Sequence, residues 1–157
     1  MGSFRRRSRR DVVPAWTGGR GARPRVLLEH PDPAALRVLG DGLEDEGFDV
    51  LTCSGPRPEV GPRKRCPLLR GEACPGADGA DVVVTGLLVE DDEQGRIVLA
   101  LTNLPDGPPV LLEATSLQAQ RRFGPGEAPT LHYPFADAHQ LAAQIRGLLR
   151  DHTPVPG

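Results

Sequence analysis

The sequence contains no apolar run near the length of about 18 residues that a membrane-spanning helix requires. Residues 1–24 are basic, and no apolar stretch of signal-peptide length lies among them, so export is not indicated. We therefore expect a cytoplasmic protein that has no membrane partner.

Motifs of several enzyme classes are also missing. No Gly-x-Ser-x-Gly turn is present, which argues against a serine hydrolase of the Ser-His-Asp type. The glycine-rich stretch at 18–21 does not follow a predicted strand, so the chain lacks the phosphate-cradling loop of nucleotide-binding proteins. No Cys-x-x-Cys pair occurs either.

Charge divides the chain into unequal parts. Residues 1–24 contain seven arginines and one acidic residue, Asp11, although the 157-residue chain has a net charge of −2. Such a composition buries too little apolar surface to fold alone, so we expect a disordered basic arm at 1–24, a domain at 25–151 and a flexible tail at 152–157. The arm could contact nucleic acid through phosphates, but a solvated leader is the simpler interpretation.

Short apolar runs alternate with amphipathic segments through the rest of the chain. The run 26–28 is typical of a strand buried on both faces. Asp32 and Pro33 then supply an N-cap and a first helical residue, and a helix is expected as far as Gly47. Further strands are predicted at 48–53, 81–85, 110–114 and 130–133, and further helices at 97–104, 116–123 and from a cap at Asp137 through 149. The run 97–101 is also compatible with a strand, but we favour the helix.

This alternation predicts a doubly wound α/β domain with a parallel sheet covered on both faces. Residues 54–80 interrupt the pattern, because five prolines leave room for little more than a helical turn around 68–70. In such sheets the functional crevice lies beyond the carboxyl ends of the strands. The residues that leave the predicted strands are therefore the candidate site.

At these strand ends the chain resembles the receiver domain of two-component response regulators. The similar segments are 26–33, 47–50, 81–86, 109–115 and Tyr133-Pro134-Phe135, and they match in order and spacing over 25–150 except in the second crossover. The resemblance implies a flavodoxin-like (CheY-like) fold with five parallel strands in the order 2-1-3-4-5, here with the second crossover helix reduced or replaced by a Pro/Cys-rich loop. It also implies a cis Tyr133–Pro134 bond.

The same resemblance implies a degenerate pocket. A working receiver transfers a phosphoryl group to an aspartate after the third strand, with Mg²⁺ held by acids after the first. Here the acceptor position falls on Gly86, which has no side chain to phosphorylate, and we expect neither phosphoryl transfer nor bound Mg²⁺. The acidic pair falls on His30 and Pro31, although a register shifted by one would bring Glu29 or Asp32 there. The predicted pocket comprises His30, Pro31, Asp32, Gly86, Ala114, Thr115, Tyr133 and Pro134.

Three cysteines leave alternatives open. Cys53 ends the second predicted strand, and Cys66 and Cys74 follow in the proline-rich loop. With His30 they offer four ligands of the kind that zinc prefers, although their spacing matches no usual zinc motif. A disulfide that acts as a redox switch is a second interpretation, and three small buried thiols are the third and simplest.

The sequence thus predicts a receiver-like signalling domain that works without phosphorylation, is not an enzyme and acts through protein partners. Its interaction surface is expected on the fourth strand, the fourth helix and the last helix, around Tyr133 and Phe135. The alternative function is a metal- or thiol-based sensor built on Cys53, Cys66 and Cys74.

Overall fold

A five-stranded parallel sheet forms the centre of the molecule. The computed structural model describes residues 15–56, 66–125, 129–135 and 137–152. The sheet has the order β2-β1-β3-β4-β5, which confirms the predicted topology. Its strands are β1 (Arg25–Glu29), β2 (Asp49–Cys53), β3 (Val82–Thr85), β4 (Val110–Leu112) and β5 (Thr130–Leu131). The last two are shorter than the sequence predicts.

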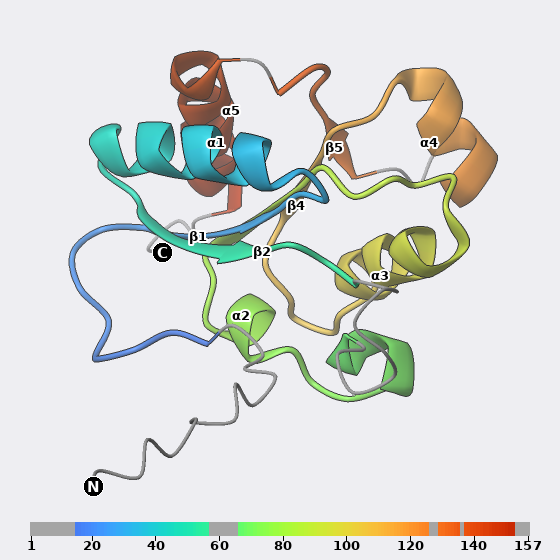
Figure 1. Ribbon diagram of the computed structural model, residues 1–157, viewed down its shortest axis with the longest axis horizontal. Helices are drawn as coiled ribbons and strands as arrows, with labels where there is room; N and C mark the ends of the chain where they lie inside the picture. Colours follow the sequence, from blue (N-terminus) through green and yellow to red (C-terminus); the bar gives the residue numbers. More distant parts are fainter. Residues whose placement is uncertain (1–14, 57–65, 126–128, 136, 153–157) are drawn as a thin grey trace, which may run out of the picture.

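Helices cover both faces of this sheet (Figure 1). Asp32 caps the first helix by accepting a hydrogen bond from the Ala34 amide at 2.9 Å, and Asp137 does the same for the last helix through the His139 amide at 2.8 Å. Residues 97–101 are helical, as favoured. The long helices are α1 (Pro33–Asp45), α3 (Asp92–Thr102), α4 (Ser116–Phe123) and α5 (Ala138–His152).

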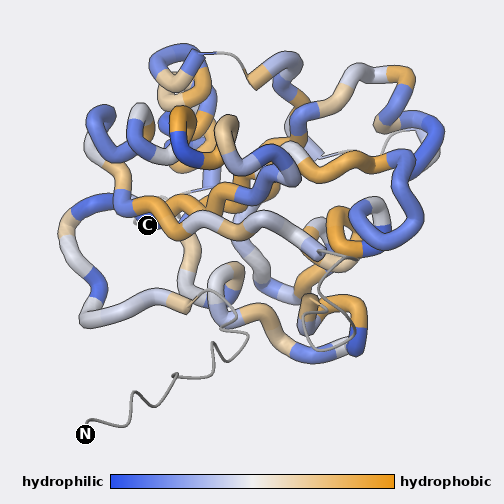
Figure 2. The backbone as a smooth tube through the Cα atoms, in the orientation of Figure 1, coloured by the Kyte–Doolittle hydropathy of each residue, from blue (hydrophilic) through white to orange (hydrophobic). Residues whose placement is uncertain are grey.

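Side-chain alternation along the strands divides the core into two layers. Val26 and Leu28 of β1 pack in the layer beneath α1 and α5, whereas Leu27 packs in the layer beside α3. Figure 2 shows the apolar residues concentrated along the strands and on the helix faces turned toward them. Because successive side chains point to opposite faces, the residues that leave each strand are also divided between two sides of the sheet.

The second crossover is shortened, as the prolines predict. Its helical content among the described residues is one 3₁₀ turn, η3 (Pro67–Arg70), and one four-residue helix, α2 (Pro75–Asp78). Residues 57–65 lie outside the described residues. None of the helices in the described ranges has the length and apolarity needed to cross a membrane.

The predicted basic arm divides at Ala15. Residues 1–14 lie outside the described residues, whereas residues 15–24, which we call the N-terminal strap, run past α2 before they enter β1 (Figure 1). Trp16 of the strap donates a hydrogen bond to the Gly76 carbonyl at 2.8 Å. Contacts of this arm with the folded part were not predicted.

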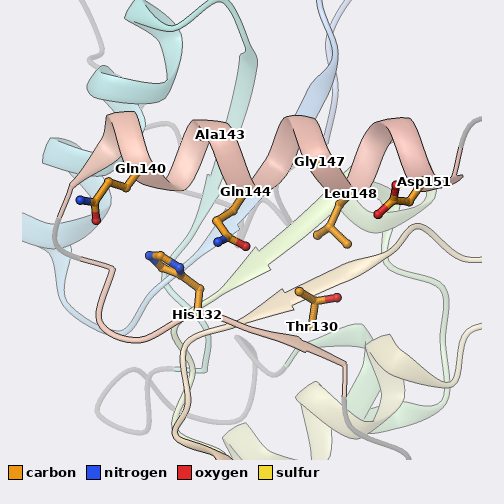
Figure 3. A pocket seen from close by; sticks show the side chains of 8 residues that line it. All are labelled: Thr130, His132, Gln140, Ala143, Gln144, Gly147, Leu148 and Asp151. Carbon is orange, nitrogen blue, oxygen red and sulfur yellow. The ribbon is translucent and has the colours of Figure 1, made fainter.

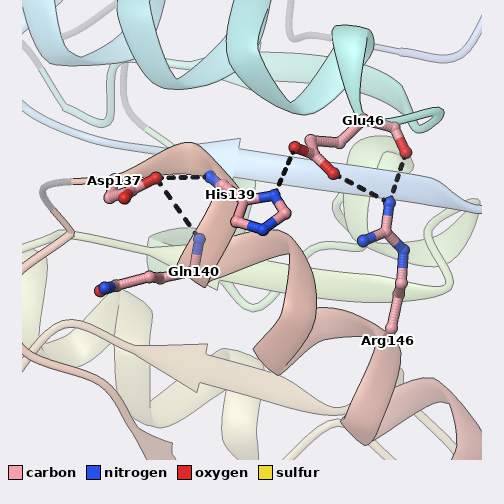
Figure 4. Close-up of polar contacts among 5 residues, drawn as sticks. All are labelled: Glu46, Asp137, His139, Gln140 and Arg146. Carbon is pink, nitrogen blue, oxygen red and sulfur yellow. Dashed lines mark hydrogen bonds and ion pairs between the residues drawn. The ribbon is translucent and has the colours of Figure 1, made fainter.

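A polar clasp joins the end of α1 to α5 (Figure 4). The Glu46 carboxylate lies 2.8 Å from Nδ1 of His139 and 3.2 Å from a guanidinium nitrogen of Arg146, which also donates to the Glu46 carbonyl at 2.6 Å. The Arg146 guanidinium stacks over the Phe48 ring at 5.4 Å. The hydrogen bond to Glu46 raises the pKa of His139, and the bonds from His139 and Arg146 lower the pKa of Glu46.

The clasp predicts a pH-dependent contribution to stability. The part due to His139 is complete below the unfolded-state pKa of histidine, about 6.5, and is lost as pH rises through the raised folded-state pKa. The part due to Glu46 is present above the unfolded-state pKa and is lost as pH falls through the lowered folded-state pKa. We expect His139→Gln to be less stable than wild type at about pH 5.5, with a smaller difference at about pH 8.5, in urea denaturation. An equal difference at both pH values would contradict the role of His139.

Candidate functional site

The His30 side chain fills the hollow at the end of β3. The register pairs Glu29 with Thr85, so His30 and Gly86 leave their strands side by side. A Cβ atom built on Gly86 would lie 2.4 Å from Cδ2 and 2.9 Å from Nε2 of the His30 ring. No side chain other than hydrogen therefore fits at this position while His30 keeps its conformation.

Glu113 completes this arrangement. Its Oε1 lies 3.5 Å from Nε2 of His30, and its other oxygen, Oε2, accepts a hydrogen bond from the Phe135 amide. The Asp32 amide donates to Nδ1 of His30 at 3.0 Å, which leaves the proton of the neutral ring on Nε2, facing Glu113. The loops after β1, β4 and β5 are thus joined through His30 and Glu113 above Gly86. Glu113 is not among the predicted pocket residues, because its only signal in the sequence is an acidic residue within the predicted apolar strand 110–114.

Glu29 lies on the opposite side of the sheet from His30. Its side chain is 3% exposed, the Thr85 side chain hydrogen-bonds it, and its Oε1 has no hydrogen-bond partner among the described residues. Burial raises the pKa of Glu29 to about 7, while the bond with Thr85 acts in the other direction. This carboxyl is therefore substantially protonated near neutral pH.

The three cysteines gather on the Glu29 side of the sheet. Glu29 pairs with Cys53 in the register of β1 and β2, and Cys53, Cys66 and Cys74 all pack against the core layer that contains Leu27. All three are free thiols. Burial raises the pKa of Cys53 to about 12 and that of Cys66 to about 11, so both remain protonated at neutral pH, in the less reactive form.

The alternation of β1 separates His30 from these thiols. His30 follows Leu28 in pointing toward the α1 side, whereas the cysteines pack on the α3 side. In the parts of the chain that the structure describes, no three His, Cys, Asp or Glu side chains are arranged to hold a metal ion. The four candidate zinc ligands, which are the three cysteines and His30, therefore do not come together in the structure.

Mg²⁺, which the receiver resemblance implies, does not fit the side chains at the strand exits. This ion requires several oxygen ligands in octahedral geometry. Glu29 lies on the α3 side, the Asp32 carboxylate caps α1, and the Glu113 carboxylate is held by the Phe135 amide. The three carboxylates therefore do not converge on one point.

The remaining predicted pocket residues are dispersed. Ala114 is buried beside α3, and the exposed Thr115 caps α4 in a capping box with Gln118. Pro31 is exposed, and the exposed Tyr133 and Pro134 are joined by a cis bond, as predicted. Phe135 does not belong to the predicted interaction surface, because it is only 7% exposed and packs in the core beneath α5.

A groove of about 560 Å³ runs between β5 and α5 (Figure 3). Side chains from the strand and the helix face each other across it. The lining residues are Thr130, His132, Gln140, Ala143, Gln144, Gly147, Leu148 and Asp151. Half of these residues are polar and uncharged, so the groove offers hydrogen-bonding groups along α5, one of the elements of the predicted interaction surface.

Solved receiver domains share this fold. The receiver domain of a signal transduction histidine kinase from Syntrophus aciditrophicus is 17% identical with a TM-score of 0.58, and the match covers 85% of this chain and 96% of that one. An orphan response regulator of H. pylori is 20% identical with a TM-score of 0.54 over 84% and 100% of the two chains. The BeF3-activated DrrB receiver domain is 17% identical with a TM-score of 0.51 over 82% and 98%.

No protein-family model matches the chain, and no curated protein matches its sequence. At identities of 14% to 20% the structural matches establish the CheY-like fold of this domain. The chemistry of the site has to be argued from its own residues.

The buried Glu29 predicts that stability falls as pH rises. Between about pH 4.5 and 7 the Glu29 carboxyl binds more protons in the folded than in the unfolded state, so its contribution to the free energy of unfolding decreases across that window, on the order of 3 kcal/mol, and then levels off. We expect Glu29→Gln to remove this decrease, so that its stability relative to wild type improves from pH 4.5 to 8 in urea denaturation. A parallel loss of stability in wild type and Glu29→Gln over that range would contradict this role of Glu29. His139→Gln is the control, because it keeps Glu29 and should keep the decrease that Glu29 causes.

Proposed function

We propose that this protein is a receiver-like signalling domain, related to phosphorelay signal transduction, that works without phosphorylation and acts through protein contacts. The observation that carries the proposal is the contact of His30 with Gly86. Where the receiver resemblance implies an acceptor aspartate, this chain has a bare backbone covered by an imidazole ring.

The electrostatics of the crevice support this proposal. Phosphoryl transfer requires positive charge aimed at the oxygens of the transferred group. Here the carboxylate of Glu113 faces the same hollow, and its oxygen would lie 3.2 Å from a Cβ atom on Gly86. Tyr133 stands where the resemblance implies a lysine. A phosphoryl group in this hollow would therefore be repelled by the Glu113 carboxylate, and Tyr133 offers no positive charge to stabilise it.

Exposed apolar side chains at the carboxyl edge of the sheet favour protein contacts. Leu88, Leu117 and Tyr133 follow β3, β4 and β5 and are 57%, 57% and 62% exposed. Because parallel strands end at the same edge, all three side chains follow the carboxyl edge of the sheet. Apolar patches rimmed by polar residues are typical of protein-binding surfaces.

The sensor alternative receives less support. The thiols are half-buried, and Cys53 and Cys66 are protonated at neutral pH, whereas reactive cysteines are thiolates in electropositive surroundings. Ionisation of the neighbouring Glu29 carboxyl raises the pKa of all three thiols further. These features favour space-filling cysteines.

Incubation with a small phosphodonor and Mg²⁺ tests the proposal. We expect intact-mass measurement to show no phosphoryl group on the protein, because the acceptor position has no carboxylate and the neighbouring carboxylates do not converge on a metal ion. Addition of beryllium fluoride with Mg²⁺ is expected to leave the amide NMR spectrum unchanged.

His30→Ala is the matched control for this experiment, since His30 is the nucleophilic side chain nearest to Gly86. Stoichiometric phosphorylation of the wild type would refute the proposal. The His30→Ala variant would then show whether His30 carries the phosphoryl group. Spectral changes at residues around Gly86 on addition of beryllium fluoride would refute the proposal equally.

A further inference from the structure

The N-terminal strap lies against the shortened second crossover. In Figure 1 the strap passes beside α2 and then curves round to the start of β1. Trp16, the single tryptophan of the chain, donates its indole N–H to the Gly76 carbonyl of α2 at 2.8 Å. The Trp16 ring also stacks on the guanidinium of Arg25 at 4.9 Å. A segment some 60 residues away in sequence is thereby fixed to the crossover.

The backbone of α2 is shaped to receive this indole ring. A Cβ atom on Gly79 would lie 2.4 Å from Cδ1 and 3.0 Å from Nε1 of Trp16. Gly79 has φ of −94°, a conformation that any residue adopts, so the lack of a side chain serves the approach of Trp16 and not a backbone turn. Glycine at position 79 therefore allows the Trp16 ring of the strap to pack against the end of α2.

Asp81 anchors the other end of the strap. Its Oδ1 pairs with the Arg20 guanidinium at 2.6 Å, and its Oδ2 accepts from the Arg25 amide at 2.8 Å. Arg25 itself is buried, and its Nε has no hydrogen-bond partner among the described residues. The strap is therefore attached to α2 through Trp16 and to Asp81 through Arg20, and the Arg25 guanidinium also donates to the Gly18 carbonyl at 3.5 Å.

Trp16 packs on the side of the sheet where the second crossover is shortened. It packs against the same core layer as Cys66, Leu68 and Cys74, which belong to the crossover. Apart from Trp16 and Pro24, every residue of the strap is exposed, and its ion pair involves an Arg20 side chain that is 56% exposed. Segments with few buried contacts open locally at low cost in free energy.

We propose that the strap is a releasable cover of the second crossover, and that its opening, which loosens α2 and increases the exposure of the half-buried Cys74 at its N-terminus, is a conformational change built into this fold. The proposal does not depend on how the domain signals. It rests on the Trp16 contacts with Gly76, Gly79 and Arg25, and on the exposure of the rest of the strap. The hollow above Gly86, by contrast, is already filled by His30 and Glu113.

Labelling of Cys74 by an alkylating reagent under native conditions, followed residue by residue, tests the strap. We expect Trp16→Ala to raise the labelling rate of Cys74 by about tenfold or more, because the crossover loses its cover. Gly79→Ala is expected to have a similar effect while it keeps the tryptophan, and to shift the fluorescence emission of Trp16 toward that of the unfolded chain.

Gly19→Ala is the matched control, since a Cβ atom on Gly19 of the same strap would meet nothing within 4 Å. It should leave both the labelling rate and the emission as in wild type. In the double variant Trp16→Ala/Gly79→Ala, the second substitution should add nothing to the first, because its collision partner is gone. Unchanged Cys74 labelling in both Trp16→Ala and Gly79→Ala, or full additivity in the double variant, would overturn the proposal.

Discussion

The approach of the His30 ring to the backbone of Gly86 determines what the crevice of this domain contains. Because Gly86 has no side chain, the imidazole lies where a Cβ atom would otherwise be, and Glu113 reaches it from the end of β4. The Phe135 amide then holds the same carboxylate, so three loops meet through two side chains. This connection between the loops is made by side chains and a backbone amide of the chain itself.

The alternation of side chains along β1 gives the two sides of the sheet separate roles. Leu28 and His30 point toward α1 and α5, whereas Leu27 and Glu29 point toward the second crossover and α3. The His30 side is a closed polar contact. The Glu29 side combines a buried carboxyl, three protonated thiols and a crossover whose cover comes from the N-terminal strap. Proton uptake by Glu29 and the proposed opening of the strap would therefore both act on the core layer that lies beside α3 and the shortened second crossover.

Local signals explain which parts could be predicted from the sequence. The apolar run 26–28, the cap at Asp137 and the prolines of 54–80 each act within a few residues, and they predicted the first strand, the last helix and the reduced crossover. The strand order followed from the resemblance to receiver domains. The contacts of Trp16 with Gly76 and of His30 with Gly86 join distant segments, and composition carries no signal for such pairings. The arginines and glycines of residues 1–24 therefore predicted only a disordered arm, with no contact of Trp16. Phe135 illustrates the same limit, since its burial depends on packing beneath α5.

A double-mutant cycle between Gly86 and His30 tests the central contact most directly. Gly86→Ala in the wild-type background forces a methyl group into the imidazole ring, and we expect a loss of about 1–3 kcal/mol in the free energy of unfolding. In a His30→Ala background the same substitution should cost far less, because the ring is absent. An equal cost of Gly86→Ala in both backgrounds would show that His30 does not occupy the hollow above β3.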